Sequence, residues 1–256
     1  MAPPTTSSFQ ITTSSFPPDA GLEFVGSNNI RDDIYPAIDV TKVSALRQPG
    51  KVVLITGAGR GIGRSMAVQY ARANVSTIII CARTATELDE VECRIKEANK
   101  RVEVWKEVFS VTDRAAAQDL AKRVADAKGK LDILINNAGM SRPWKNIHEI
   151  DPDDYWRVME VNVYGPLLLT HAFLPLLVNN AETNSTHVNI INITSIGAVT
   201  MGPGGSPYSI SKLALQKLGE FVGLEYGAKG VNVVGIHPGV VETKVAKVVK
   251  ELNNRR

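Results

Sequence analysis

Short apolar runs alternate with amphipathic stretches from residue 51 onward. Six of these runs have the length and the β-branched content of buried strands. They are Val52–Ile55, Ser76–Ala82, Val102–Phe109, Leu131–Asn136, Val188–Thr194 and Val231–His237. Between them, helical patterns cover Ile62–Ala73, Thr84–Asn99, Asp113–Lys128, Pro152–Val178 and Tyr208–Tyr226. This alternation predicts an α/β fold, a doubly wound parallel sheet of about six strands with helices on both faces.

Helix-capping residues support these boundaries. Thr84 is followed three residues later by Glu87, the spacing of a capping box. Asp151 precedes a proline at the first helical position, which is typical of a helix start. Gly227 and Gly230 stand where the last long helix is expected to end.

The chain divides into an extension and one domain. Residues 1–48 show no clear periodicity, and their first part is rich in Ser, Thr and Pro, so we expect an N-terminal extension that is partly disordered. Residues 49–256 are expected to form a single domain. No basic residue precedes Arg31 and no continuous apolar core is present near the start, so the sequence predicts neither a secretory signal nor a mitochondrial presequence.

Composition excludes several function classes. Apolar residues make up 44% of the chain, charged residues 21%, and the net charge is +3, a balance that does not favour nucleic acid as a partner. Cys81 and Cys93 suggest no disulfide framework, and the four histidines lack metal-ligand spacing, so we expect a reducing, cytoplasmic location and no metal. No run of about 18 apolar residues occurs, and no membrane span is expected.

The segment Lys51–Gly63 combines a strand, a glycine-rich turn and a helix start. Its glycines are Gly57, Gly59, Gly61 and Gly63. A strand that turns sharply into a helix presents backbone N–H groups and a positive dipole end, which suit a phosphate group. The spacing differs from the usual G-x-G-x-x-G, and a glycine turn without a ligand is the alternative.

Two arginines bear on which dinucleotide would bind. The second strand ends in Ala82 and Arg83, where an acid would accept the ribose 2′-hydroxyl of NAD. Arg83, together with Arg60 in the glycine turn, could instead hold a 2′-phosphate. This pattern predicts NADP(H), with NAD(H) less favoured; the alternative is two solvated surface arginines.

A tyrosine and a lysine lie one helical turn apart downstream. Tyr208 and Lys212 share a helix face, and Ser195 follows the fifth predicted strand. A free tyrosine has a pKa near ~10, too high for acid–base work at neutral pH. A nearby ammonium is expected to lower it, and the serine hydroxyl could hold a substrate oxygen beside the phenol.

With these motifs in order, residues 51–243 resemble the short-chain dehydrogenase/reductase family, whose fold is Rossmann-like. The matching segments are Thr56–Gly63, Asn136–Gly139, Asn162, Ser195, Tyr208-x-x-x-Lys212 and Pro238-Gly239-x-Val241-x-Thr243. The resemblance implies four catalytic residues: Tyr208 as proton donor or acceptor, Ser195 as the group that orients the substrate, Lys212 as ribose ligand, and Asn162 holding a relay water. It also implies cofactor contacts at Gly57, Arg60, Gly61, Ile62, Gly63, Arg83, Asn137, Ala138, Gly139, Tyr208, Lys212, Pro238, Gly239, Val241 and Thr243.

The sequence departs from the family pattern at two places. Ser110 stands where the family usually has an adenine-contacting Asp. Few residues follow Thr243, so the usual seventh strand is apparently missing, and the strand Val231–His237 is expected at the sheet edge.

The resulting hypothesis is an NADP(H)-dependent oxidoreductase acting on a small carbonyl or alcohol substrate. The alternative is a dinucleotide-binding or interaction protein with reduced or lost turnover. The broad apolar faces of Pro152–Val178 and Tyr208–Tyr226, and the same surface in the family, predict a homodimer; core packing alone is the other explanation.

Overall fold

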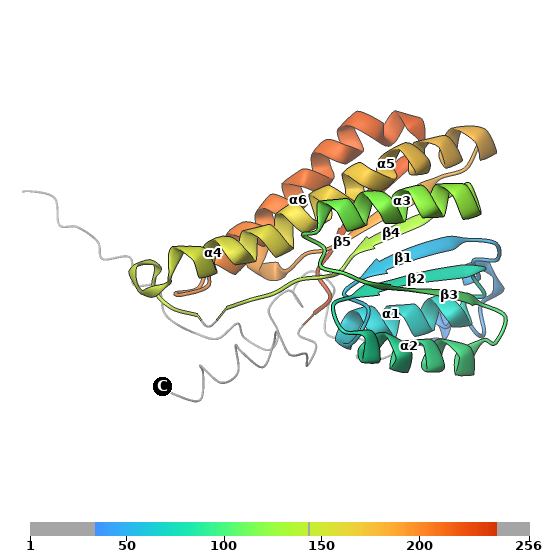
Figure 1. Cartoon of the computed structure of the whole chain (residues 1–256), viewed down its shortest axis with the longest axis horizontal. Coiled ribbons are helices and arrows are strands. Elements are labelled where there is room, and N and C mark those ends of the chain that lie inside the picture. The colour runs from blue at the N-terminus through green and yellow to red at the C-terminus, as the bar shows by residue number, and fades with distance from the viewer. Residues whose placement is uncertain (1–33, 143, 240–256) are drawn as a thin grey trace, which may run out of the picture.

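A computed structural model describes residues 34–142 and 144–239 of the chain. Their six strands form one parallel sheet in the order β3-β2-β1-β4-β5-β6 (Figure 1). The strands are β1 (Val52–Thr56), β2 (Thr77–Ala82), β3 (Glu103–Val108), β4 (Ile133–Asn136), β5 (Val188–Ile193) and β6 (Val231–Ile236). The order reverses between β1 and β4, so the predicted doubly wound, Rossmann-like fold is confirmed.

Helices cover both faces of the sheet. They are α1 (Gly61–Arg72), α2 (Ala85–Ala98), α3 (Arg114–Lys128), α4 (Pro152–Met159), α5 (Gly165–Asn184) and α6 (Ser206–Tyr226). Figure 1 shows α1 and α2 on one face, with α3, α5 and α6 on the other. Right-handed crossovers between parallel strands produce this layering.

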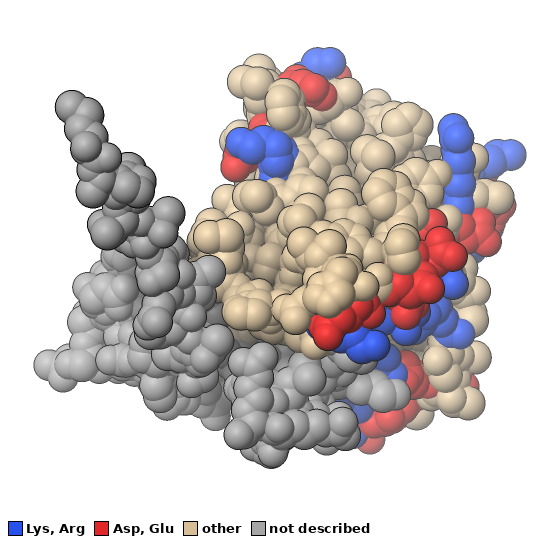
Figure 2. Space-filling model, turned by 90° about the vertical axis from the view of Figure 1, so that its left-hand side faces the viewer, with Lys and Arg blue, Asp and Glu red and all other residues tan. Residues whose placement is uncertain are grey.

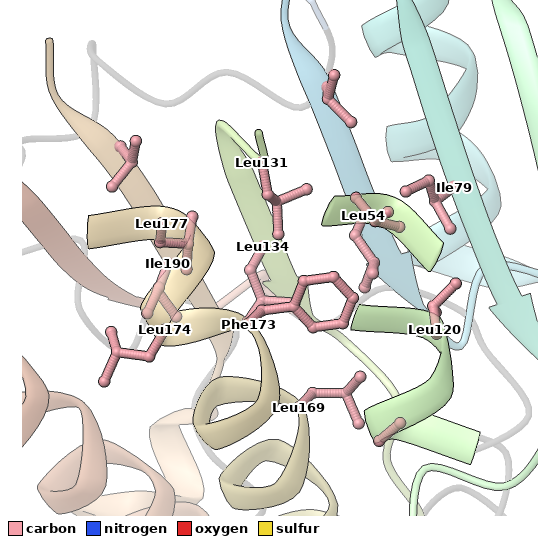
Figure 3. Close-up of a cluster of buried hydrophobic side chains, with 14 of the residues drawn as sticks. Leu54, Ile79, Leu120, Leu131, Leu134, Leu169, Phe173, Leu174, Leu177 and Ile190 are labelled. Carbon is pink, nitrogen blue, oxygen red and sulfur yellow. The ribbon is translucent and has the colours of Figure 1, made fainter. Parts of the chain in front are cut away.

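Each helical layer has its own apolar core. Leu54, Leu134 and Ile190 of the sheet pack with Phe173 of α5 on the α3–α5–α6 side. Phe173 is fully buried and lies in the middle of the side chains in Figure 3. On the α1–α2 side, alternate residues of the same strands form a second cluster. Strands buried on both faces explain why their sequences read as continuous apolar runs.

The predicted helix Pro152–Val178 is not one continuous α-helix. After α4, residues Glu160–Tyr164 form a π-helical turn, and α5 then continues to Asn184. Such turns widen a helix by one residue and frequently occur at functional sites. Periodicity could not reveal this turn, because both helical parts keep an apolar face.

The capping predictions had mixed outcomes. Asp151 caps α4 by accepting a hydrogen bond from the Asp153 N–H at 2.8 Å. Thr84 is the N-cap of α2, but its side chain makes no capping hydrogen bond, so the predicted capping box is wrong. Glu87 instead pairs with Arg60 in the glycine turn, because that partner carries a full positive charge.

A buried carboxylate ties the amino ends of the central strands together. Asp132, only 2% exposed, accepts hydrogen bonds from the Val52 N–H at 2.8 Å and from Lys51 Nζ at 3.0 Å. Asn180 of α5 also donates to it, at 3.2 Å. These hydrogen bonds outweigh burial and hold the pKa of Asp132 below its usual value of 3.8.

The two cysteines lie in different surroundings. Cys81 in β2 is buried, whereas Cys93 in α2 is exposed. Burial strongly raises the pKa of the Cys81 thiol. Both are free, in agreement with the expectation that they form no disulfide.

Strand β6 lies at one edge of the sheet of described strands, as predicted, and β3 at the other. Val234 and Ile236 of β6 are 48% and 39% exposed. The question of a seventh strand falls on residues 240–256, outside the described residues, as does most of the N-terminal extension.

One helical stretch has the length and composition of a membrane span. Pro152–Asn184 reaches a mean hydropathy of 1.5 in its most apolar window, of which 44% is buried inside the fold. A core helix passes the same test, so this stretch is weak support for a span; the absence of one stays a prediction.

Candidate active site

The glycine turn meets the loop after β4 at the point where the strand order reverses. Gly57 has φ of +63°, and a Cβ there would stand 2.8 Å from the Ala138 Cα. Thr56 Oγ1 accepts hydrogen bonds from the N–H groups of Asn137 and Ala138, both at 3.0 Å. Only glycine allows this approach, so the two loops form one surface beyond the strand ends.

The side chain of Asn137 holds the glycine turn in place by hydrogen bonds. Its Nδ2 donates to the carbonyl oxygens of Thr56 at 2.9 Å and Gly57 at 3.1 Å. A Cβ at Gly63 would collide with the Gly57 oxygen, so α1 begins directly against the turn. Gly61 has φ of +55°, and Ile62 lies in the first turn of α1, so the glycine turn and the start of α1 form one continuous segment.

The predicted 2′-phosphate ligands differ in their surroundings. Arg60 Nη1 lies 3.0 Å from Glu87 Oε1 in an exposed ion pair. Arg83 is exposed and makes no ion pair within residues 34–142 and 144–239. The structure therefore leaves Arg83 available to a ligand and shows Arg60 already paired.

Asn162 occupies the π-helical turn and is completely buried. Its Oδ1 accepts from the Met140 N–H at 2.8 Å, and its Nδ2 donates to the Met140 oxygen at 2.9 Å and to Ser211 Oγ at 2.9 Å. The side chain thus links the loop after β4 to α6. Both hydrogens of Nδ2 are used in these bonds.

Lys212 reaches the same point from α6. It is 4% exposed, and its Nζ donates to the Ile193 carbonyl oxygen at 2.7 Å. A Cβ at Gly139 would lie 3.5 Å from this Nζ and 3.3 Å from Asn162 Oδ1. Burial lowers the pKa of Lys212 to about 8, so the ammonium is still mainly charged at neutral pH.

Tyr208 and Ser195 face each other beside Gly197. The site of a Cβ on Gly197 is 3.4 Å from Ser195 Oγ and 3.8 Å from Tyr208 Cδ1. Burial raises the pKa of Tyr208, while a hydrogen bond with Ser195 opposes that rise. The predicted lowering of the Tyr208 pKa is therefore wrong for the chain alone, because burial dominates; the Lys212 ammonium lies 5.7 Å from the ring centroid and donates its hydrogen bond to a backbone oxygen.

The loop after β4 packs against the segment that precedes α6. Ring carbons of Trp144 lie 3.2 Å from where a Cβ would stand on Gly202 and on Gly205. Trp144 Nε1 and Ser206 Oγ are buried without a hydrogen-bond partner among the described residues. The contact between these two segments therefore combines the apolar ring of Trp144 with two buried polar atoms that lack a partner among the described residues.

A groove of about 400 Å³ lies between α6 and β6. Its lining includes Ser195, Glu220 and His237, but none of Tyr208, Lys212 and Asn162. Of the four predicted catalytic residues, the groove is therefore lined by Ser195 alone.

The remaining predicted cofactor residues follow β6. Pro238 and Gly239 follow β6 after one residue, His237, with Gly239 at φ +78°. Val241 and Thr243 lie outside the described residues. Ser110, at the place of the usual acid, shares a hydrogen bond with Thr112 Oγ1 at 2.8 Å.

Some residues that shape the site carried no sequence signal of their own. Thr56 was noted only as part of the motif, and Ser211 lies inside an ordinary helical pattern. Glu87 was assigned to a helix cap. The close packing of Glu87 against Gly59 could not be predicted from the sequence, because 28 positions separate the two residues. Groups of three or more His, Cys, Asp or Glu that could hold a metal ion do not occur in the described part of the chain.

The doubly wound sheet, the glycine cradle and the Tyr–Lys–Ser–Asn group define a dinucleotide-dependent oxidoreductase. The sequence model of the short chain dehydrogenase family matches residues 51–254, and the chain belongs to this family. It is similar to short chain dehydrogenase mpl6 of Monascus purpureus, with 39% identity over 242 residues, 93% of this chain and 79% of that protein. That match includes part of the N-terminal extension.

Solved structures show the same fold. The Pseudomonas aeruginosa RhlG/NADP active-site complex superposes with a TM-score of 0.73 at 26% identity, covering 85% of this chain and 80% of that one. An NAD⁺-bound xylitol dehydrogenase has a TM-score of 0.69 at 29% identity, covering 75% of this chain and 71% of that one. The family binds NAD(P), and structural relatives with each cofactor occur.

Proposed function

We propose that this chain is an NADP(H)-dependent oxidoreductase that acts on a small carbonyl or alcohol substrate, with Tyr208 as the acid–base group. The observation that carries the proposal is the convergence of Ser195, Tyr208, Lys212 and Asn162 around Gly139 and Gly197. They come from three separate segments, and core packing does not require polar groups to gather there.

The residues around the glycine turn fit a dinucleotide. Gly57 and Gly63 let the turn pack directly against the loop after β4 and against the amino end of α1, where backbone N–H groups can bind a phosphate. Arg83, exposed and without an ion pair among the described residues, supplies a cation at the end of β2, where Ala82 provides no acid. A bound nicotinamide would supply or accept the hydride; Gly139, Lys212, Pro238 and Gly239 would hold its half of the dinucleotide.

Protein groups account for the proton in the reaction. In the direction of reduction, the Tyr208 hydroxyl donates a proton to the substrate oxygen, which Ser195 Oγ holds in place. The charged Lys212 stabilises the phenolate that remains. Asn162 bonds to Met140 and Ser211, and so joins the loop after β4 to α6, the helix that carries Tyr208 and Lys212.

Selectivity for NADP(H) is expected to rest mainly on Arg83. A guanidinium can form two charge-assisted hydrogen bonds with a phosphate group. Arg60 can contact the 2′-phosphate as well only if its ion pair with Glu87 breaks or rearranges. We therefore expect the protein to bind NADP(H) moderately more tightly than NAD(H).

The test combines a binding titration with an activity assay. Quenching of protein fluorescence would give the Kd values of NADPH and NADH, and loss of NADPH absorbance would report turnover with a panel of aldehydes and ketones. We expect tighter binding of NADPH, and turnover that Tyr208→Phe removes. Binding without turnover on any carbonyl compound would favour the alternative, a dinucleotide-binding protein without activity.

We further propose a cytoplasmic homodimer that binds neither nucleic acid nor membrane. The exposed apolar residues of α5 and α6 support the dimer: Leu167 is 42%, Leu213 48% and Phe221 54% exposed. Leu168 and Leu215, on the opposite faces, are buried in the core. Figure 2 shows that one side of the molecule has a broad uncharged area, with charged side chains toward its upper and right-hand parts.

A further inference from the structure

An acid lies beside the glycine turn, although the end of β2 carries none. Glu87, in the first turn of α2, packs so close to Gly59 that a Cβ there would stand 2.7 Å from Glu87 Oε2 and 2.9 Å from its Cβ. The same position on Gly59 is 3.3 Å from the Ala82 Cβ. The carboxylate therefore occupies the corner between the glycine turn and the end of β2.

This corner is where a doubly wound dinucleotide fold receives the adenosine ribose. An acid at this place accepts hydrogen bonds from the 2′-hydroxyl of NAD and repels a 2′-phosphate. In this chain the acid comes from α2 and not from the end of β2. It also holds Arg60, whose Nη1 lies 3.0 Å from Glu87 Oε1.

Glu87 thus acts against a 2′-phosphate in two ways. Its negative charge repels the phosphate directly, and its ion pair occupies one of the two arginines that would bind it. Arg60 and Glu87 are 49% and 31% exposed, so the pair is partly screened and can be broken by a ligand.

We propose that Glu87 is a specificity-determining residue of the cofactor site, which narrows the preference for NADP(H) over NAD(H). The inference rests on the proposed function. Neutralising Glu87 should free Arg60 and remove the repulsion, so that the preference for the 2′-phosphate increases.

The neighbouring helical turn provides a matched control. Glu90 also lies on α2 and also pairs with an arginine of α1, with its Oε1 3.1 Å from Arg64 Nη1. It is joined to Arg94 as well, at 2.8 Å. Glu90→Gln removes the same charge from the same helix–helix contact, but one turn farther from Gly59.

The experiment compares Glu87→Gln, Glu90→Gln and the unchanged protein by calorimetric titration with NADPH and NADH. Adenosine 2′,5′-bisphosphate and 5′-AMP, titrated in the same way, report on the adenosine half without the nicotinamide. For Glu87→Gln we expect the ratio of Kd(NADH) to Kd(NADPH) to rise about tenfold, the size expected for a partly screened charge near a phosphate. Glu90→Gln should leave the ratio within about twofold of its original value, because salt screens more distant charges.

The outcomes separate this inference from the proposed function. If the unchanged protein binds neither dinucleotide, the proposed function fails. If it binds both and Glu87→Gln leaves the ratio unchanged, or shifts it no more than Glu90→Gln does, Glu87 only joins α1 to α2 and the inference is wrong. A melting temperature equal to that of the unchanged protein ensures that altered affinity does not arise from misfolding.

Discussion

Lys212 Nζ lies 5.7 Å from the centroid of the Tyr208 ring and donates its hydrogen bond at 2.7 Å to the Ile193 carbonyl oxygen, not to the phenol. The ammonium therefore stands beneath the ring as a fixed charge. Because burial lowers its pKa only to about 8, Lys212 remains a cation at neutral pH. Its influence on Tyr208 is that of a neighbouring charge, which favours the phenolate once a proton has left.

Tyr208→Phe should reduce turnover by ~10²–10⁴-fold, the usual contribution of a placed acid–base group, because the ring still packs but has no proton to transfer. The Kd of NADPH should stay nearly the same. Tyr226→Phe, at the far end of α6, is the control and should retain full activity. A Tyr208→Phe enzyme with more than roughly a tenth of the original rate would place the acid–base role elsewhere.

Arg83→Asp should reverse the cofactor preference. The new acid at the end of β2 would repel a 2′-phosphate and accept the 2′-hydroxyl of NAD, and the Kd of NADPH should rise at least about tenfold. Arg101→Asp makes the same charge change just before β3, at the opposite ends of the strands, and should leave the preference unaltered. Equal affinity of the unchanged protein for both dinucleotides would contradict the underlying hypothesis.

Asp132→Asn should lower the free energy of unfolding at pH 7 by about 1–3 kcal/mol, because the Val52 N–H and Lys51 lose a charged acceptor in a buried position. The pKa of Asp132 is lower in the folded chain than the ordinary 3.8, so its stabilising effect is present above about pH 4 and is lost as the pH falls through the folded value. Urea unfolding of both proteins between pH 7 and pH 3 measures this. A difference that stayed constant over the whole range would show that the charge of Asp132 is unimportant.

Leu213→Glu should convert the predicted homodimer into a monomer. Residues Ile210, Leu213, Phe221 and Leu224 are exposed on one face of α6, which also carries the Lys217–Glu220 ion pair, and an additional unpaired carboxylate there could not be buried without cost. Light scattering at micromolar concentration should give twice the chain mass of 27.7 kDa for the unchanged protein and once that mass for the variant. Val108→Glu, on the other edge of the sheet, serves as the control. A monomeric unchanged protein would contradict the dimer directly.

The elements were predictable from the sequence because buried parallel strands leave a plain signal. The runs around Leu54, Ile79 and Ile190 are apolar on both faces, and each was located to within a few residues. Tyr208 and Lys212 could also be grouped, since helical spacing alone puts them on one face. Gly57 and Ala138 were not tied by any local pattern; the motif order and the family resemblance brought them to one site.

Three features escaped prediction because they depend on tertiary contacts. The π-helical turn at Asn162 is stabilised by Met140 and Ser211, which are distant in sequence. Glu87 pairs with Arg60 and not with the backbone at the start of its own helix. The periodicity of the sequence does not indicate which of these two partners the carboxylate binds. The raised pKa of Tyr208 follows from burial, which the sequence shows only as an average over the fold.

The unequal burial of the two thiols allows the opening of the folded core to be followed by chemical labelling. Exposed Cys93 on α2 should react quickly with an alkylating reagent, whereas Cys81, 1% exposed and part of the apolar core on the α3–α5–α6 side, can react only when this core opens. The rate of the slow labelling phase of the native chain therefore measures how often this core opens, and the fast phase of Cys93 serves as the reference.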